Sequence, residues 1–153
     1  MNIFFAIAED FIGDTVLKTQ TLTVRYENEL CMVGVLFLFS RGTLLVTVNS
    51  NDDSVVVHKA IDQMAARSLI GRGGVAETDN SPIVRSCEGK ILTNLWRCES
   101  APGYFDSVDF AFGSLVFPTI KVFSVTSELF AAAIGPHQGP NQKEGAGRTS
   151  PVD

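Results

Sequence analysis

The sequence is poor in the residues that carry most metal and nucleophile chemistry. Among 153 residues there are only two histidines and three cysteines, and the cysteines do not have the spacing of a zinc site. An odd number of cysteines also disfavours the disulfide framework of a small secreted protein. The Gly-x-Ser-x-Gly pattern of serine hydrolases is absent. We therefore expect reduced thiols, no metal and no cofactor.

Clustered positive charge and long apolar runs are missing as well. Lysine and arginine total 12 against 17 acidic residues, so the net charge is −5, and no basic patch is available to neutralise phosphates. A membrane-spanning helix needs about 20 apolar residues, and no run approaches that length. The start, Met1–Asp10, lacks the positive segment of a signal peptide. We expect a cytoplasmic protein that binds neither nucleic acid nor membranes.

The sequence is rich, by contrast, in the pattern of buried strands. A continuous apolar run covers residues 30–39, and a turn signal at 41–42 separates it from a second run at 43–48. Branched and aromatic runs bounded by turn residues predict adjacent strands. The first run is apolar on both faces, so it needs cover on both: a helix on one face, and loops, a second helix or a partner subunit on the other. We expect segments 30–48 and 104–125 to pair in one shared sheet.

Helices are predicted near both ends of the sheet region. Apolar residues in the 4–12 segment recur at helical spacing, and Gly13 is well placed to end that helix. Residues 59–70 are ambiguous but fit a helical stripe, whereas the polar, glycine-rich composition of 71–89 predicts a long irregular connection. A last helix is expected over 126–134, capped by a hydroxyl side chain at its start.

The predicted fold class is α+β, with a mainly antiparallel, curved sheet of about six or seven strands and helices at the N- and C-terminal ends. Residues 1–135 form a single globular domain in this prediction, and residues 136–153, poor in aliphatic side chains, form a disordered tail. The expected core consists of large apolar residues from all of these segments: Phe4, Phe11, Val33, Val35, Phe37, Val46, Trp96, Phe110, Phe112 and Val122.

The most suggestive local pattern begins at Trp96 and continues into the strand that starts at Tyr104. Strand alternation places Asp106 in a row with Tyr104 and Phe110. A carboxylate among apolar neighbours must be paired or hydrogen-bonded, or its pKa rises. One interpretation is a ligand anchor or acid/base group beside Trp96 and Tyr104. The structural alternative, which we favour, is that Asp106 bonds the backbone of the 102–103 turn.

The other polar candidates favour structural roles. Asn51–Asp53 lacks the oxygen spacing of a calcium loop, so a solvated hairpin turn is expected. Gly71–Gly74 matches neither the lysine-bearing phosphate loop nor the dinucleotide fingerprint. His58 has no marked nucleophile near it, and His137 lies in the expected tail. No activating base adjoins the cysteines, so no thiol nucleophile is indicated.

An aromatic and acidic arrangement follows the predicted turn at 49–54. Its members are Trp96, Gly103, Tyr104, Asp106 and Phe110, downstream of Asp52, Asp53 and Ser54. This arrangement resembles small uncharacterised bacterial α+β domains, some of which are similar in size and acidity to immunity or antitoxin-type proteins. The resemblance covers about residues 15–125 and carries over no catalytic residue. It implies a protein that acts by binding another protein.

Two functional hypotheses follow. The favoured one is a non-catalytic protein-interaction domain that forms a homodimer or, like an immunity protein, neutralises another protein. It is motivated by the missing catalytic constellation, the doubly apolar strand and the acidic charge. The alternative is a small-ligand-binding protein or an unrecognised enzyme, with a pocket near Trp96, Tyr104 and Asp106 beside the 71–89 connection.

Overall fold

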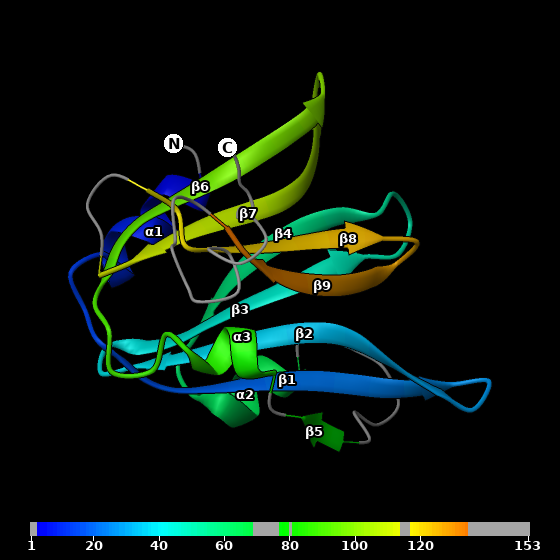
Figure 1. Ribbon diagram of the computed structural model, residues 1–153, viewed down its shortest axis with the longest axis horizontal. Coiled ribbons are helices and arrows are strands. Elements are labelled where there is room, and N and C mark those ends of the chain that lie inside the picture. The colour runs from blue at the N-terminus through cyan, green and yellow to red at the C-terminus, as the bar shows by residue number, and fades with distance from the viewer. Residues whose placement is uncertain (1–2, 69–76, 80, 114–116, 135–153) are drawn as a thin grey trace, which may run out of the picture.

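Two antiparallel sheets stacked on one another make up most of the structure (Figure 1). The computed structural model describes residues 3–68, 77–79, 81–113 and 117–134. Within these residues the first sheet has the strand order β4-β3-β2-β1-β5 and the second has the order β6-β7-β8-β9. The first sheet contains β1 (Val16–Tyr26), β2 (Glu29–Phe39), β3 (Gly42–Asn49), β4 (Ser54–Ala60) and β5 (Glu77–Asp79). The second contains β6 (Leu92–Ala101), β7 (Tyr104–Phe112), β8 (Ile120–Val125) and β9 (Glu128–Ala133).

Three short helices pack around the two sheets. Helix α1 (Ile3–Phe11) packs against β4 and β6 and so bridges the two sheets, and α2 (Gln63–Ser68) covers β2, β3 and β4 from outside. Helix α3 (Pro82–Arg85) lies between β1 and β9. None of the helices described here is long and apolar enough to cross a membrane. The helix expected over 4–12 is thus confirmed, and Gly13 ends it with a φ of 93°.

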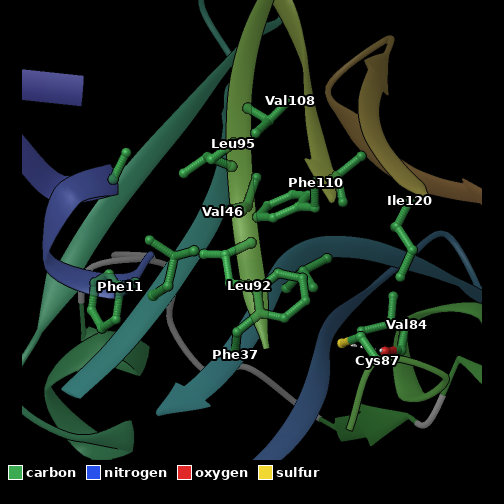
Figure 2. Packing of buried hydrophobic residues seen from close by; sticks show 14 of the residues in the cluster. Phe11, Phe37, Val46, Val84, Cys87, Leu92, Leu95, Val108, Phe110 and Ile120 are labelled. Carbon is green, nitrogen blue, oxygen red and sulfur yellow. Dashed lines mark hydrogen bonds between the residues drawn. The ribbon is translucent and has the colours of Figure 1, made fainter. Parts of the chain in front are cut away.

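The expectation of one curved sheet is wrong, because segments 30–48 and 104–125 belong to different sheets. They meet face to face: the ring centroid of Phe37 lies 4.8 Å from that of Phe110 and 5.7 Å from that of Phe112 (Figure 2). An alternating apolar pattern shows that a strand buries one face, but does not say whether a neighbouring strand or a second sheet covers it. All of the expected core residues are buried except Trp96, which is half-buried.

The doubly apolar strand is the centre of the first sheet and is covered on both faces, as predicted. Its inner face packs on the second sheet and α1 through residues such as Val35 and Phe37, both fully buried. Its outer face joins a separate buried cluster: Leu22, Leu36, Leu45, Ala60 and Ala66. Since Ala66 belongs to α2, a second helix provides that cover. The register of β1 and β2 shifts beside Gly34, which marks a bulge there.

The predicted C-terminal helix is wrong, since residues 128–133 form the strand β9. Thr126 and Ser127 have φ values of 46° and 66°, the left-handed pair of a two-residue hairpin turn. At the start of this strand Leu129 is 1% exposed and its neighbour Phe130 is 39% exposed, so the two side chains lie on opposite faces. The alanines that favour a helix are overruled by pairing with β8.

The segment expected to be irregular contains ordered elements in its described part, namely β5 and α3. The Glu88 carboxylate fastens the end of this segment to β1, because Thr19 donates both its backbone N–H and its hydroxyl to Glu88 Oε2 at 2.8 Å. Those two bonds hold the pKa of Glu88 below its ordinary value. Residues 69–76 and the expected tail at 136–153 lie outside the described residues.

Candidate functional site

The three residues singled out from the sequence lie at three different places. Trp96 lines a hollow between α1 and the β6–β7 hairpin, whereas Asp106 lines another hollow on the β8 side of the same sheet. The hydroxyl of Tyr104 donates to the backbone oxygen of Asp53 at 3.5 Å. That all three residues line one pocket stays a prediction. The polar groups differ from one of these places to the next.

Asp53 joins the β3–β4 turn to the second sheet. Its backbone oxygen accepts a hydrogen bond from the Ser124 hydroxyl, and its carboxylate accepts from the backbone N–H and, at 3.1 Å, the hydroxyl of Ser127. Burial, together with the carboxylates of Asp53, Asp106 and Asp52, raises the pKa of Tyr104. Tyr104 is thus a neutral donor in a junction between the sheets.

The Asp106 hollow, of about 440 Å³, is lined by a polar set that the sequence analysis did not assemble. Lys121 bridges two of its neighbours: Nζ lies 2.8 Å from Asp109 Oδ1 and donates to the Ser107 hydroxyl at 3.3 Å. Cross-strand pairing of β6, β7 and β8 brings these residues together. The turn bond expected of Asp106 is made instead by Glu99, whose carboxylate accepts from the Gly103 N–H at 2.6 Å.

The described thiols are poorly suited to attack a substrate. Burial raises the pKa of Cys98, and the nearby Asp109 carboxylate adds to that effect. Burial raises the pKa of Cys87 to about 12, and its Sγ donates to the Val84 carbonyl at 3.0 Å. Cys87 and Lys90 line a third hollow of about 340 Å³ beside α3. Burial, with the Glu128 and Glu29 carboxylates, raises the pKa of Cys31.

The hollow beside Trp96, of about 210 Å³, is lined almost entirely by aromatic rings around one arginine. The guanidinium carbon of Arg97 lies 3.8 Å from the ring centroid of Phe105 and 5.9 Å from that of Phe4. Both distances fall within the range of a cation–π interaction. Phe5, next to Phe4 on α1, is 63% exposed at the same place. Helix α1 and the β6–β7 hairpin thus hold a cation among aromatic rings, one of which, that of Phe5, is exposed.

Arg97 differs from Arg41, Lys59 and Lys121 in having no carboxylate partner among the described residues. Within the described residues, ion pairs hold Arg41, Lys59 and Lys121 to aspartates, but none involves Arg97. An arginine stacked on rings keeps its N–H donors at the rim of the planar group, where they can bind an acceptor from outside. The arrangement can therefore receive a carboxylate that arrives with an apolar or aromatic neighbour.

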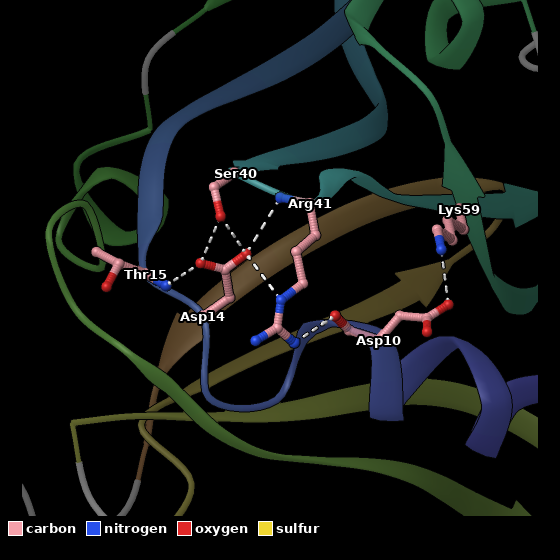
Figure 3. Close-up of polar contacts among 6 residues, drawn as sticks. All are labelled: Asp10, Asp14, Thr15, Ser40, Arg41 and Lys59. Carbon is pink, nitrogen blue, oxygen red and sulfur yellow. Dashed lines mark hydrogen bonds and ion pairs between the residues drawn. The ribbon is translucent and has the colours of Figure 1, made fainter.

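Arg41 illustrates the opposite arrangement at the other end of α1 (Figure 3). Its Nη1 donates to the Asp10 backbone oxygen at 3.1 Å, and its backbone N–H donates to Asp14 Oδ2 at 3.2 Å. Asp14 also accepts from the Ser40 hydroxyl and the Thr15 N–H. Burial acts to raise the pKa of Asp14, but these hydrogen bonds outweigh it and the pKa is lowered.

The remaining polar candidates have structural surroundings where they are described. His58 Nε2 lies 3.0 Å from the Thr47 hydroxyl, and burial lowers the pKa of the ring. Residues 51–53 form the expected hairpin turn, stabilised by the Asn49 and Asp52 side chains. His137 and Gly71–Gly74 lie outside the described residues. Within the described part of the chain, no cluster of side chains could hold a metal ion.

Sequence analysis singled out Trp96 but missed the arginine beside it. Arg97 and Phe105 both lie in the stretch that drew attention, yet only the fold brings Phe4 and Phe5 of α1 against them. The available signal was an arginine directly after the single tryptophan of the chain. It did not indicate a site by itself, because the rings that position the guanidinium come from the other end of the sequence.

One family comparison gives a match. A family model described as "Family of unknown function (DUF6334)" matches residues 1–138, a span that contains every element from α1 to β9. No curated protein matches the chain. No solved structure matches it either.

Proposed function

The chain belongs to the family of unknown function DUF6334, and we propose that it is a non-catalytic protein-interaction domain that binds its partner at the hollow between α1 and the β6–β7 hairpin. The observation that carries this proposal is the Arg97 guanidinium, stacked on Phe105 at 3.8 Å with no carboxylate paired to it in the described residues. Such a group is positioned in advance for an acidic acceptor.

The composition of the hollow supports a protein partner. Tryptophan and arginine dominate the energetic centres of protein interfaces, and aromatic residues and arginine are enriched in them generally. The lining combines Trp96, Arg97, Phe105 and two phenylalanines of α1, one of them 63% exposed. The matching partner segment has a carboxylate next to an aromatic or aliphatic side chain. An immunity-like neutraliser of another protein, as the sequence resemblance implies, would use a site of this kind.

The non-catalytic part of the proposal is supported by the engagement of the other reactive groups. The ammonium of Lys121 is directed to Asp109 and Ser107, and the Cys98 thiol has a raised pKa. His58 is bonded to Thr47. A nucleophile needs an adjacent base or a lowered pKa, and neither condition is met by these groups.

The test is a selection from a displayed library of random peptides. The full chain should enrich peptides that carry Asp or Glu beside Phe, Tyr, Trp or Leu. Peptides selected by Arg97→Gln should no longer be enriched in Asp or Glu. Peptides selected by Phe5→Ala should be less enriched in the neighbouring Phe, Tyr, Trp or Leu. Matched controls are Arg85→Gln, an exposed arginine of α3, and Met64→Ala, an apolar side chain 80% exposed on α2. Enrichment of no acidic motif, or the same motif with Arg97→Gln, would overturn the proposal.

A further inference from the structure

The four sheet edges of the molecule are protected to different degrees. β5 has three residues, β4 is fastened to α1 by the 2.8 Å ion pair of Lys59 with Asp10, and β6 has three register shifts against β7. Short strands, attached helices, charges and bulges are the usual devices that keep a sheet edge from pairing with another chain. β9 has neither a bulge nor an ion pair to a helix, since its six residues pair with β8 without a shift, and α3 packs against it. Its sole charge is Glu128, at its first position.

The backbone of β9 presents unpaired groups to the outside. Ile134 N–H donates to the Thr119 oxygen at 3.0 Å, and this bond sets the alternation of the ladder. In an antiparallel pair the residues alternate between bonding the neighbour strand and facing away from it. The even-numbered residues from 128 to 134 therefore bond β8. The backbone N–H and C=O groups of Leu129, Ala131 and Ala133 face away from β8, which is the only strand paired with β9 in the described residues.

We infer that two copies of this chain pair through β9 to form a homodimer with one continuous sheet. A row of outward N–H and C=O groups is completed by another strand, and β9 itself is a complementary one. With a two-fold axis through Ala131, Leu129 of one copy lies opposite Ala133 of the other, and Phe130 lies opposite Ala132. Each large side chain then meets a small one, as good cross-strand packing requires.

Charge is compatible with this two-fold pairing. Glu128 of one copy lies opposite Ile134 of the other, so the carboxylates of the two copies sit at opposite ends of the shared ladder. Like charges directly opposite each other would destabilise it. The four strands of each second sheet would join as β6-β7-β8-β9-β9-β8-β7-β6, which removes the β9 edge from solvent.

The first test is the mass of the full chain in solution by sedimentation velocity. The inference predicts a concentration-dependent species of twice the monomer mass. Ala131→Pro removes an outward N–H without touching the bonds to β8, and should shift the weight-average mass to that of the monomer. Ala133→Asp adds a charge at an exposed position of the same edge and should do the same, which keeps the test valid if the proline variant misfolds.

Hydrogen exchange tests whether the two copies pair through β9. The Leu129, Ala131 and Ala133 amides should be protected at high protein concentration and exchange fast on dilution, while even-numbered β9 amides stay protected throughout. A monomer at every concentration, a dimer unaffected by both variants, or protection of the three amides in dilute monomer would overturn the inference. The result is separable from the peptide selection: Arg97→Gln should leave the dimer intact, and Ala133→Asp should leave the acidic peptide preference intact.

Discussion

The two ends of α1 each receive an arginine, and they use it in opposite ways. At the C-terminal end Arg41 donates a hydrogen bond to the Asp10 carbonyl and forms an ion pair with Asp14, so its guanidinium is engaged within the molecule. At the N-terminal end Arg97 rests on the rings of Phe4 and Phe105 and meets no carboxylate of the described residues. The comparison teaches that Arg41 helps to stabilise the fold, whereas Arg97 is positioned by the fold for the proposed binding of a partner.

The largest expected effect comes from the last residue of α1, where Phe11→Ala should loosen the packing of the helix as a whole. Phe11 is fully buried and its ring centroid lies 4.9 Å from that of Phe39. Truncating a buried phenylalanine costs about 3–5 kcal/mol of unfolding free energy, measurable by urea denaturation. The matched control is Phe5→Ala on the same helix, because an exposed side chain should change stability by no more than about 0.5 kcal/mol. Equal losses for the two variants would contradict the described position of α1.

The next effect is at the Arg41 end, where Asp14→Ala should destabilise the fold without changing binding. Its carboxylate accepts from Thr15, Ser40 and Arg41, and its side chain is only 12% exposed. Leaving such donors without a partner costs about 1–3 kcal/mol. Thermal denaturation measures the loss, and the peptide selection should be unchanged. A variant of unchanged stability would show that this end of α1 is not fastened as described.

The pH dependence of stability should follow the same carboxylate. The folded chain lowers the pKa of Asp14 below its ordinary 3.8, so the stabilisation is present above that value and is lost as the pH falls through the folded pKa. Asp14→Asn should therefore be less stable than wild type at about pH 7 and converge with it in acid. Glu88→Gln should behave alike, because Glu88 is also lowered from 4.5. Parallel acid-unfolding curves for variant and wild type would contradict this role.

The smallest effect on stability should separate the two arginines most cleanly. Arg97→Gln should alter the unfolding free energy by less than about 0.5 kcal/mol, as for other surface changes, yet abolish recognition of acidic peptides. Arg41→Gln should lower stability by up to about 1 kcal/mol, the range of an exposed ion pair, and leave recognition intact. Calorimetric unfolding and peptide binding, measured on both variants, compare the two. The same response from both arginines would remove the distinction.

The sequence predicted individual helices and strands better than it predicted which of them pack or pair together. The amphipathic spacing from Phe4 to Phe11 and the apolar runs of β2 and β3 depend on neighbours along the chain, and those predictions hold. Whether β2 and β7 share a sheet or face each other depends on contacts far apart in sequence, and there the prediction was wrong. The prediction of a helix at β9 was wrong for a related reason. Its alanines favour a helix, but hydrogen bonding to β8 makes the segment a strand.

The candidate site shows the same limit. Trp96 was predicted from its own surroundings, but the stacking of Arg97 needs α1, which joins β6 only in the folded chain. Tyr104 and Asp106 share a strand with Phe110, as alternation predicted, yet Tyr104 bonds Asp53 and Asp106 lines the hollow that also contains Lys121. A strand pattern specifies which residues share a face. It does not specify what each of them meets at the ends of that face.

Trp96 is the single tryptophan of the chain and lines the Arg97 hollow, so its fluorescence reports directly on the proposed site. The decisive measurement is a titration of the full chain with a peptide that carries glutamate beside phenylalanine, compared with the same peptide carrying glutamine. The account predicts a saturable change in tryptophan emission for the acidic peptide, lost with the glutamine peptide and lost again in Arg97→Gln. A change of equal size with both peptides, or with Arg97→Gln, would contradict it.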